Sequence, residues 1–275
     1  MLQTEIDLAA QLARQAGALV LEVYASRFDV ELKGKSDPVT EADRRANAFL
    51  VAGLRERFPT DGIVAEESLD HTDSMRAGRC WFVDPLDGTK EFIARNGEFS
   101  VMIGLAIDGR AVLGVVYQPD GDKLYRGVVG QGASLEHGGA TRALQVSELA
   151  APSALRLVVS RSHRSKDTDA VVQRLGISAE RPSGSVGLKV GLITEQSADL
   201  YVHMSGHASL WDACGPDAIL HAAGGRFTDL YGEPIDYRST QMKVARGLLA
   251  CNAASFAAVA PVVREVATAA GIGAA

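Results

Sequence analysis

The stretch from Cys80 to Phe92 reads CWFVDPLDGTKEF, and the interpretation of the rest of the chain starts from it. Its apolar run, Trp81–Val83, predicts a short buried strand. We expect the strand to end at Asp84-Pro85, because proline has a fixed φ and no N–H to donate to a neighbouring strand. Polar residues follow at once, so they are predicted to lie at a strand end.

These polar residues suit a magnesium-assisted phosphate site. Asp84 and Asp87 supply the hard oxygen ligands that Mg²⁺ prefers. Gly88 allows a tight turn that exposes backbone amides, and Thr89 adds a hydroxyl beside them. A plain strand followed by a turn is the alternative, since Asp, Pro and Gly are ordinary turn residues. The stretch by itself leaves both interpretations open.

Two further acidic segments favour the phosphate site. The short apolar run Ile63–Ala65 is followed by Glu66-Glu67, and Leu210-Trp211-Asp212 precedes a helix-like segment. With the central loop, they resemble the Glu-Glu pair, the Asp-Pro-(Ile/Leu)-Asp-Gly-(Thr/Ser) loop and the late Trp-Asp of the inositol monophosphatase superfamily, in the same order. The resemblance covers nearly the whole chain. It implies a metal-dependent, lithium-sensitive phosphatase with an α/β fold, an alternating α-β-α-β-α layered sandwich.

The bulk composition narrows the class of protein. A chain of 275 residues allows one large or two modest domains with an ample core. The net charge of −6 argues against a nucleic-acid polymer as partner, and no apolar run approaches the roughly 20 residues of a membrane span. The three scattered cysteines resemble neither a zinc site nor a disulfide framework. Since the N-terminus also lacks a signal peptide pattern, we expect a cytoplasmic protein.

Hydrophobic patterning divides the chain into two predicted subdomains, residues 1–150 and 151–275. The first, with most metal ligands, is expected to pack two helices on a mostly antiparallel sheet, and the second, with Asp212 and substrate contacts, to alternate strands and helices. Residues 69–79 are expected to be an exposed polar loop, and residues 130–143 are Gly-rich and polar, with no element predicted. The predicted helices span residues 6–23, 39–58, 166–175, 186–196, 212–223 and 254–270. The predicted strands span residues 30–33, 63–65, 81–83, 99–107, 111–117, 124–129, 155–159, 200–202, 226–229 and 248–251.

The resemblance implies a set of oxygen ligands for two Mg²⁺ ions, with a third ion left open. Glu66, Asp84 and the Leu86 carbonyl would hold one ion. Asp84, Asp87 and Asp212 would hold the other. No His or Cys is among them, which suits magnesium, and two such ions can activate a water and stabilise the leaving oxygen of a phosphate ester. For Asp212 taken alone, an ordinary helix N-cap is the open alternative.

The resemblance also implies catalytic residues. The segment Thr40–Asp43 matches a superfamily pattern whose Asp hydrogen-bonds the loop threonine, here Thr89, and that threonine orients the attacking water. Taken alone, Thr40 followed by Asp43 also resembles a helix capping box, with Asp in place of the usual Glu or Gln. Glu67, the second acid of its pair, is placed with Asp43 and Thr89 among the catalytic residues.

Substrate contacts are expected on the central loop and on two segments of the second half. The amides of Gly88 and Thr89 suit a phosphate as a small anion nest. The segment 160–163, Ser-Arg-Ser-His, resembles a substrate loop of bacterial bisphosphate nucleotidases, and the segment 184–189 resembles their nucleotide-phosphate contact. A solvated helix lysine is the alternative reading of the last residue of that segment. The predicted contacts on these two segments are Ser160, His163, Ser185 and Lys189.

Within the superfamily, two features favour the bisphosphate nucleotidases of the sulfate-assimilation type. The loop continues as Thr89-Lys90-Glu91-Phe92, whereas inositol phosphatases usually continue it as Thr-Asn-Phe. Inositol phosphatases also place an acid seven residues before the final metal Asp, where this chain has Ser205. The segment Ala213–Pro216 departs from the common Thr-Ala-Ala, which leaves the details of substrate fit open.

We therefore predict a Mg²⁺-dependent phosphomonoesterase that removes the 3′-phosphate of adenosine 3′,5′-bisphosphate. A phosphatase of inositol 1-phosphate or another small sugar phosphate is the alternative within the superfamily. A metal- or phosphate-binding regulator without catalysis is the alternative outside enzymes, although the complete set of acidic residues argues against it. The expected partner is a small phosphorylated substrate, with no nucleic acid and no membrane, and a homodimer is left open.

Overall fold

The computed structural model describes residues 2–33, 37–68, 78–162 and 164–273. Its helices are α1 (Gln3–Tyr24), α2 (Glu41–Arg57), α3 (Thr89–Ile93), α4 (Lys166–Leu175), α5 (Val186–Thr194), α6 (Leu210–Ala222) and α7 (Phe256–Ala269). The strands of the first half are β1 (Val30–Lys33), β2 (Asp37–Thr40), β3 (Gly62–Ala65), β4 (Arg79–Asp87), β5 (Ser100–Ile107), β6 (Arg110–Gln118), β7 (Lys123–Val128), β8 (Gly132–His137) and β9 (Ala140–Leu144). Those of the second half are β10 (Arg156–Ser160), β11 (Ala179–Ser183), β12 (Leu200–His203), β13 (Gly225–Thr228) and β14 (Leu248–Asn252).

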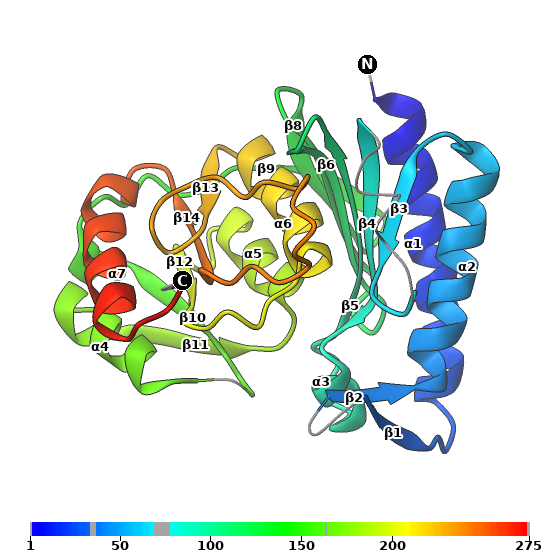
Figure 1. Cartoon of the computed structure of the whole chain (residues 1–275), viewed down its shortest axis with the longest axis horizontal. Helices are drawn as coiled ribbons and strands as arrows, with labels where there is room; N and C mark the ends of the chain where they lie inside the picture. The colour runs from blue at the N-terminus through cyan, green and yellow to red at the C-terminus, as the bar shows by residue number, and fades with distance from the viewer. Residues whose placement is uncertain (1, 34–36, 69–77, 163, 274–275) are drawn as a thin grey trace.

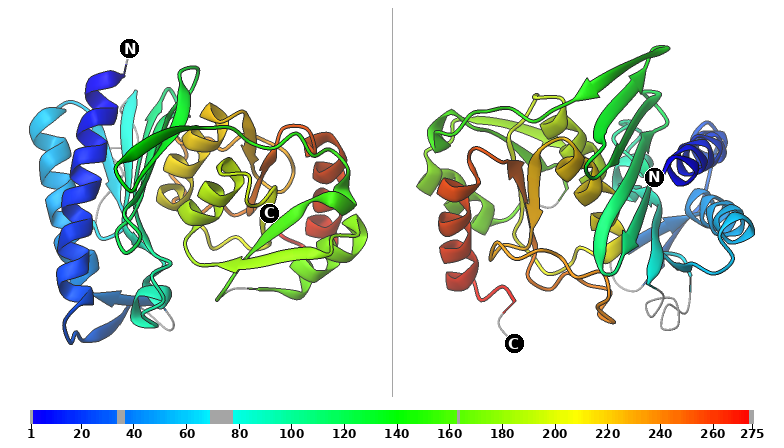
Figure 2. Two further views of the ribbon diagram at one scale, coloured as in Figure 1. Left: turned by 180° about the vertical axis from the view of Figure 1, so that it is seen from behind. Right: turned by 90° about the horizontal axis from the view of Figure 1, so that it is seen from above.

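These elements stack in five layers, as Figure 1 shows. Helices α1 and α2 cover one face of a seven-stranded sheet, α5 and α6 fill the space between the two sheets, and α4 and α7 cover the outer face of a five-stranded sheet. Figure 2 shows the same order of layers from behind and from above. The α-β-α-β-α fold expected from the sequence is therefore confirmed.

The larger sheet has the order β3-β4-β5-β6-β7-β8-β9, in which β3 and β4 run parallel and every other pair is antiparallel. This confirms the mostly antiparallel sheet of the first half. Its outer core is built by the apolar stripe of α1, where Ala13, Ala16 and Val20 are fully buried against the sheet. A stripe at helical spacing can bury only one face of the helix, which fixes how α1 lies on the strands.

The smaller sheet has the order β11-β10-β12-β14-β13, with β10 parallel to both of its neighbours. The chain thus forms one sheet from residues before 145 and the other from residues after 155, while a subdomain boundary at residue 150 stays a prediction. Among the described residues, no helix is both long and apolar enough to cross a lipid bilayer.

Helix α6 lies unusually close to the larger sheet, and glycines allow it. A Cβ on Gly114 of β6 would lie 2.0 Å from the carbonyl oxygen of Gly215 on α6, and a Cβ on Gly104 of β5 would lie 2.5 Å from the Gly215 amide nitrogen. Real Cβ atoms do not come this close, so only glycine lets the helix and the strands meet. This contact places the start of α6 near the end of β4.

The structure corrects the predicted end of the central strand. Strand β4 does not stop at Asp84-Pro85 but continues to Asp87, and its register against β5 shifts between Asp84 and Asp87. An irregularity of this kind absorbs a proline inside a strand and redirects the side chains around it. The two aspartates therefore leave the sheet from a distorted strand end.

Other predicted boundaries were wrong where the local pattern was weak. The segment 130–143, in which no element was predicted, forms the hairpin of β8 and β9, in which alternate residues such as Ala133 and Leu135 are buried. Glycines and charged residues have low strand propensity, so the sequence of this segment did not indicate strands. Pairing with β7 stabilises them in the folded protein. Strand β11, β2 and the short helix α3 were also missed, and α6 begins at Leu210 rather than at Asp212. Most of the expected loop 69–79 lies outside the described residues.

Candidate active site

The predicted site residues meet around a cavity of about 480 Å³. It opens where the end of β4 faces the first turns of α5 and α6, so both halves of the chain contribute to its wall. Two predicted catalytic residues, Asp43 and Glu67, are not part of the wall, and His163 lies outside the described residues. The predicted residues that line the cavity are Glu66, Asp84, Leu86, Asp87, Gly88, Thr89, Ser160, Ser185, Lys189 and Asp212.

Asp84 is the most enclosed acid of the cavity, with 2% of its surface exposed. Its Oδ1 accepts a hydrogen bond of 3.0 Å from the Leu86 amide. Burial raises the pKa of Asp84 well above its ordinary value, and the charges of Glu66, Asp87 and Asp212 raise it further. A carboxylate in this position is costly unless a positive charge approaches it.

Asp87 and Asp212 are each held at a helix start. Asp87 Oδ2 accepts hydrogen bonds from Ser185 Oγ at 2.6 Å and from the Val186 and Gly187 amides at the start of α5. Asp212 Oδ2 accepts a hydrogen bond of 2.7 Å from the Ser209 amide. Ser209 is the N-cap of α6 and Asp212 the third helical residue, so the N-cap reading of Asp212 was wrong by three residues.

These two acids also have raised pKa values. Burial and the charge of Asp87 raise the pKa of Asp212 to about 6, and burial raises the pKa of Asp87. Lys189 acts in the opposite direction on Asp87, as Lys243 does on Asp212. The cavity wall therefore concentrates more negative charge than its lysines neutralise.

This wall fits a hard cation by its chemistry, since every donor is an oxygen. In the described part of the chain, however, no group of three or more His, Cys, Asp or Glu side chains converges as a metal cluster. The hydrogen bonds at the two helix starts are consistent with this, because they turn one oxygen each of Asp87 and Asp212 toward protein donors. Asp84, Asp87 and Asp212 share one cavity wall, with Glu66 beside them.

Asp43 joins the first turn of α2 to the central loop. Its Oδ2 accepts hydrogen bonds from the amide of Thr40 at 2.8 Å and from its hydroxyl at 2.7 Å, and its Oδ1 accepts one from Thr89 Oγ1 at 3.2 Å. The capping box and the contact with Thr89 are therefore both present, and the two readings of Asp43 do not exclude each other. Burial raises the pKa of Asp43, with a smaller contribution from the nearby charge of Glu67.

The central loop turns at Gly88, which has a φ of 95° and precedes the short helix α3. A Cβ at this position would lie 3.0 Å from the Glu98 carbonyl oxygen, so both the conformation and the space require glycine. Thr89 follows, and its hydroxyl also lies 3.2 Å from the Leu86 carbonyl oxygen. The loop thus presents amides and a hydroxyl beside the acidic wall.

The second half contributes Ser185 and Lys189 from α5. Ser185 is buried and has a φ of 49°, and its hydroxyl is engaged by Asp87 and by the Leu188 amide. The structure thus places this hydroxyl on a predicted metal ligand rather than free toward a substrate. A positive φ strains the backbone of a residue other than glycine, and the surrounding hydrogen bonds hold Ser185 in this conformation.

Lys189 is 3% exposed and still lines the cavity. Burial lowers the pKa of Lys189 to about 8, although Asp87, Glu91, Glu98 and Asp212 act to raise it. Its Nζ lies 5.2 Å from the centre of the Tyr201 ring and makes no hydrogen bond within the described residues. The alternative of a solvated helix lysine is therefore wrong.

Several cavity residues were not predicted. Ser205 lines the cavity and its hydroxyl lies 2.9 Å from His203 Nε2. Lys243 donates hydrogen bonds to the His207 carbonyl and to Ser209 Oγ, which brings a loop far along the chain to the start of α6. No local pattern marked this lysine, because its place in the wall depends on the pairing of its segment with Ser209.

Comparisons with known proteins identify the family of this chain. A family model described as the inositol monophosphatase family matches residues 1–266. The 3′(2′),5′-bisphosphate nucleotidase CysQ of Escherichia coli strain K12 is 38% identical over 237 residues, which are 84% of this chain and 93% of that protein. Inositol monophosphatase 1 of Mus musculus is 30% identical over 257 residues, 88% and 90% of the two chains.

A solved structure also resembles this chain. That of CysQ from Bacteroides thetaiotaomicron, titled a bacterial member of the inositol monophosphatase family, has a TM-score of 0.77 and 29% identity over 91% of this chain and 97% of the other. Proteins of this family are generally Mg²⁺-dependent phosphatases of small phosphorylated compounds. The chain belongs to the inositol monophosphatase family and is a phosphatase.

Proposed function

We propose that this phosphatase is a 3′(2′),5′-bisphosphate nucleotidase that removes the 3′-phosphate of adenosine 3′,5′-bisphosphate. The named function of the bacterial relatives supports this substrate, and so does the extension of the cavity beyond its acidic wall. A substrate with two phosphates needs a cation for the phosphate that is not hydrolysed, in addition to any metal at the reacting one.

Lys189 is the observation that carries the proposal. It is a buried ammonium that lines the cavity and has no hydrogen-bond acceptor among the described residues. The carboxylates of Asp87, Glu91, Glu98 and Asp212 offset part of the cost of burying this charge, and the open cavity leaves a ligand able to supply the hydrogen-bond acceptor. A nucleotide phosphate is such an acceptor, whereas the neutral hydroxyls of inositol are weaker ones.

We propose that Glu66, Asp84, the Leu86 carbonyl, Asp87 and Asp212 hold two Mg²⁺ ions, which would supply water activation and leaving-group stabilisation. The Thr89 hydroxyl donates a hydrogen bond to Asp43, which leaves the lone pairs of Thr89 Oγ1 available to orient a water. The amides of Gly88 and Thr89 would face the reacting phosphate. Glu67 lies outside the cavity wall, and its charge raises the pKa of Asp43.

Ser205 argues against inositol 1-phosphate as the preferred substrate. It lies in the cavity wall, and its hydroxyl is hydrogen-bonded to His203. A carboxylate at this position would accept hydrogen bonds from a polyol about twice as strongly as a hydroxyl does. The proposed cytoplasmic location and the homodimer that was left open rest on the sequence alone.

A substrate panel tests the proposal. Purified protein with Mg²⁺ is assayed for phosphate release from adenosine 3′,5′-bisphosphate, inositol 1-phosphate and fructose 1,6-bisphosphate, with chelator as the control. We expect the highest kcat/KM on the nucleotide and none without Mg²⁺. Faster turnover of inositol 1-phosphate would overturn the substrate, and Mg²⁺-independent turnover would overturn the metal site.

A further inference from the structure

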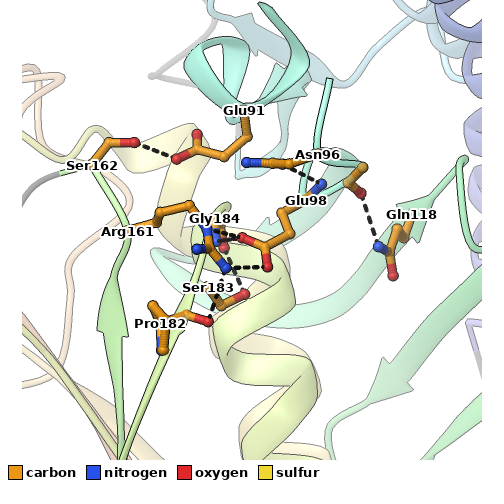
Figure 3. A network of polar contacts seen from close by, with 10 residues as sticks. Glu91, Asn96, Glu98, Gln118, Arg161, Ser162, Pro182, Ser183 and Gly184 are labelled. Carbon is orange, nitrogen blue, oxygen red and sulfur yellow. Dashed lines mark hydrogen bonds and ion pairs between the residues drawn. The ribbon is translucent and has the colours of Figure 1, made fainter. Parts of the chain in front are cut away.

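Three segments far apart in the sequence meet beside the cavity, at Glu98, Arg161 and Gly184 (Figure 3). Arg161 donates two hydrogen bonds of 2.7 Å to the carboxylate of Glu98, from Nη2 to Oε1 and from Nε to Oε2. The Gly184 amide donates a third, also of 2.7 Å, to Oε2. We call these three residues the clamp. One carboxylate of the first half thus holds two segments of the second half.

The clamp lies next to the residues that line the substrate end of the cavity. Arg161 directly follows Ser160 at the end of β10, and Gly184 directly precedes Ser185, the N-cap of α5. Ser160, Gly184 and Ser185 all line the cavity, whereas the side chains of Glu98 and Arg161 do not. The clamp therefore contacts the substrate-facing segments from behind.

Backbone packing makes the arrangement tight. A Cβ on Gly184 would lie 2.4 Å from the Glu98 carbonyl oxygen, and a Cβ on Gly88 would lie 3.0 Å from the same atom. The backbone of Glu98 is thus enclosed between the central loop and the start of α5. A second cross-link follows nearby, where Ser162 Oγ donates to the Glu91 carboxylate. A shift of Glu98 would move the substrate segments relative to the central loop.

The charges of the clamp are already paired. The two-fold hydrogen bond occupies one edge of the Arg161 guanidinium, and Arg161 Nη2 also lies 3.5 Å from the Pro182 carbonyl. Although partial burial opposes it, the hydrogen bonds from Arg161 and Gly184 lower the pKa of Glu98. A fork of this geometry fixes orientation as well as distance, and lysine cannot reproduce it.

We propose that Glu98 and Arg161 are positioning residues that set the affinity for the nucleoside 5′-phosphate part of the substrate and leave the bond-breaking step unchanged. The inference rests on the proposed nucleotidase function. The clamp holds Ser160 and the α5 start, which carries Lys189, in register with the central loop. The reacting phosphate meets the acidic wall and the central loop, which the clamp side chains do not contact. Asp87 of that wall is joined to the α5 start by its own hydrogen bonds from Ser185, Val186 and Gly187, which the clamp variants leave in place.

The two products of the reaction provide the test, because adenosine 5′-monophosphate occupies the nucleoside end and inorganic phosphate the reacting end. We expect Glu98→Gln and Arg161→Met to raise KM for adenosine 3′,5′-bisphosphate and Ki for adenosine 5′-monophosphate about tenfold, the effect of a lost charge-assisted contact. The kcat and the Ki of phosphate should change less than about twofold, since no transition-state contact is removed. The KM and nucleotide Ki of Arg161→Lys should lie between those of the wild type and those of Arg161→Met, because lysine keeps the charge and loses the two-fold hydrogen bond.

The control is the neighbouring ion pair of Arg164 and Glu180, in which Arg164 also pairs with Asp169. Its arginine is 42% exposed and its acid 27%, against 41% and 25% for Arg161 and Glu98. Arg164→Met loses two carboxylate partners, so it should lower the melting temperature at least as much as Arg161→Met does and leave both Ki values unchanged. The same rise in Ki from Arg164→Met, or equal changes for both products in the clamp variants, would overturn the inference.

The wild-type protein separates this inference from the proposed function. If it does not hydrolyse the nucleotide bisphosphate, both fall together. If it does, and Glu98→Gln and Arg161→Met leave KM and the nucleotide Ki as they were, only the positioning role falls.

Discussion

Two regions beside the cavity treat carboxylates in opposite ways. Asp84, Asp87 and Asp212 form no ion pair within the described residues. Burial raises the pKa of all three, and neighbouring carboxylates raise the pKa of Asp84 and Asp212 further. Glu98, in the clamp, is matched by Arg161, and its pKa is lowered. Both regions join the two halves of the chain, but only the second is electrostatically satisfied by the protein itself.

This difference in the pairing of carboxylates indicates the role of each region. Crowded buried carboxylates cost folding free energy, and a protein keeps them where a function needs their charge. A paired carboxylate costs little and fixes geometry. Substitutions in the acidic wall should therefore lower kcat, and substitutions in the clamp or at Lys189 should weaken substrate binding.

The largest expected effect comes from Asp84→Asn. It removes the charge at the centre of the acidic wall, so Mg²⁺-dependent turnover should fall about a thousandfold or more. Circular dichroism should show that the fold is kept, because Asn occupies nearly the same volume. Near-normal Mg²⁺-dependent activity in this variant would show that the acids were assigned to the wrong task.

A smaller loss is expected when the orientation of the water is disturbed. Thr89→Ala and Asp43→Asn should lower kcat about a hundredfold and change KM little, because orienting a nucleophile matters mainly in the transition state. Thr89→Ser is the control, since it keeps the hydroxyl that Asp43 accepts. If kcat stays and only KM rises in both variants, the pair binds substrate and does not orient water.

A binding effect is expected from Lys189→Met, which keeps the length of the buried stem and removes the charge. The kcat/KM for adenosine 3′,5′-bisphosphate should fall about tenfold or more, the effect of one charge-assisted contact. Turnover of inositol 1-phosphate, which has no second phosphate, should stay nearly unchanged. Equal losses on the two substrates would identify Lys189 as a structural residue.

The smallest expected effect is a change in melting temperature, which should have opposite signs for substitutions in the acidic wall and in the clamp. In chelator, Asp84→Asn should raise the melting temperature by a few degrees, because it relieves a buried repulsion. Glu98→Gln should lower it by about one to three degrees, the size expected when a partly exposed ion pair is lost. Differential scanning calorimetry measures both shifts. Shifts of the same sign would contradict the view that the carboxylates of the acidic wall repel one another while Glu98 is stabilised by its pairing.

Much of the chemistry was readable in the sequence because its parts are local. Asp84, Asp87 and Gly88 stay near one another however the chain folds, so their spacing suggested a phosphate loop, which the two other acidic segments favoured over an ordinary turn. The periodicity of α1 and the apolar runs of β5 and β6 predicted these elements for the same reason, since burial of one face is a local pattern. Weakly patterned strands such as β9 and β11 escaped, because exposed edge positions carry no such signal.

Tertiary structure alone decided which distant groups meet. The hydrogen bond from Thr89 to Asp43 spans 46 residues and the one from Ser185 to Asp87 spans 98. The family pattern anticipated the first of these, but nothing anticipated the second, which gives Ser185 a protein partner. The burial of Lys189 was equally hidden, because a helix sequence does not say which layer the helix will enter.

The sequence by itself determined the types of the proposed ligands, the order of the acidic segments and the helical and strand patterns, which depend on neighbours along the chain. The tertiary structure decided the bulge after Asp84, the capping of Asp87 by α5 and the pairing of Glu98 with Arg161. Each of these depends on packing between layers, where close contacts such as Gly184 against Glu98 set positions to within a fraction of an ångström. Such contacts join residues that no local pattern connects.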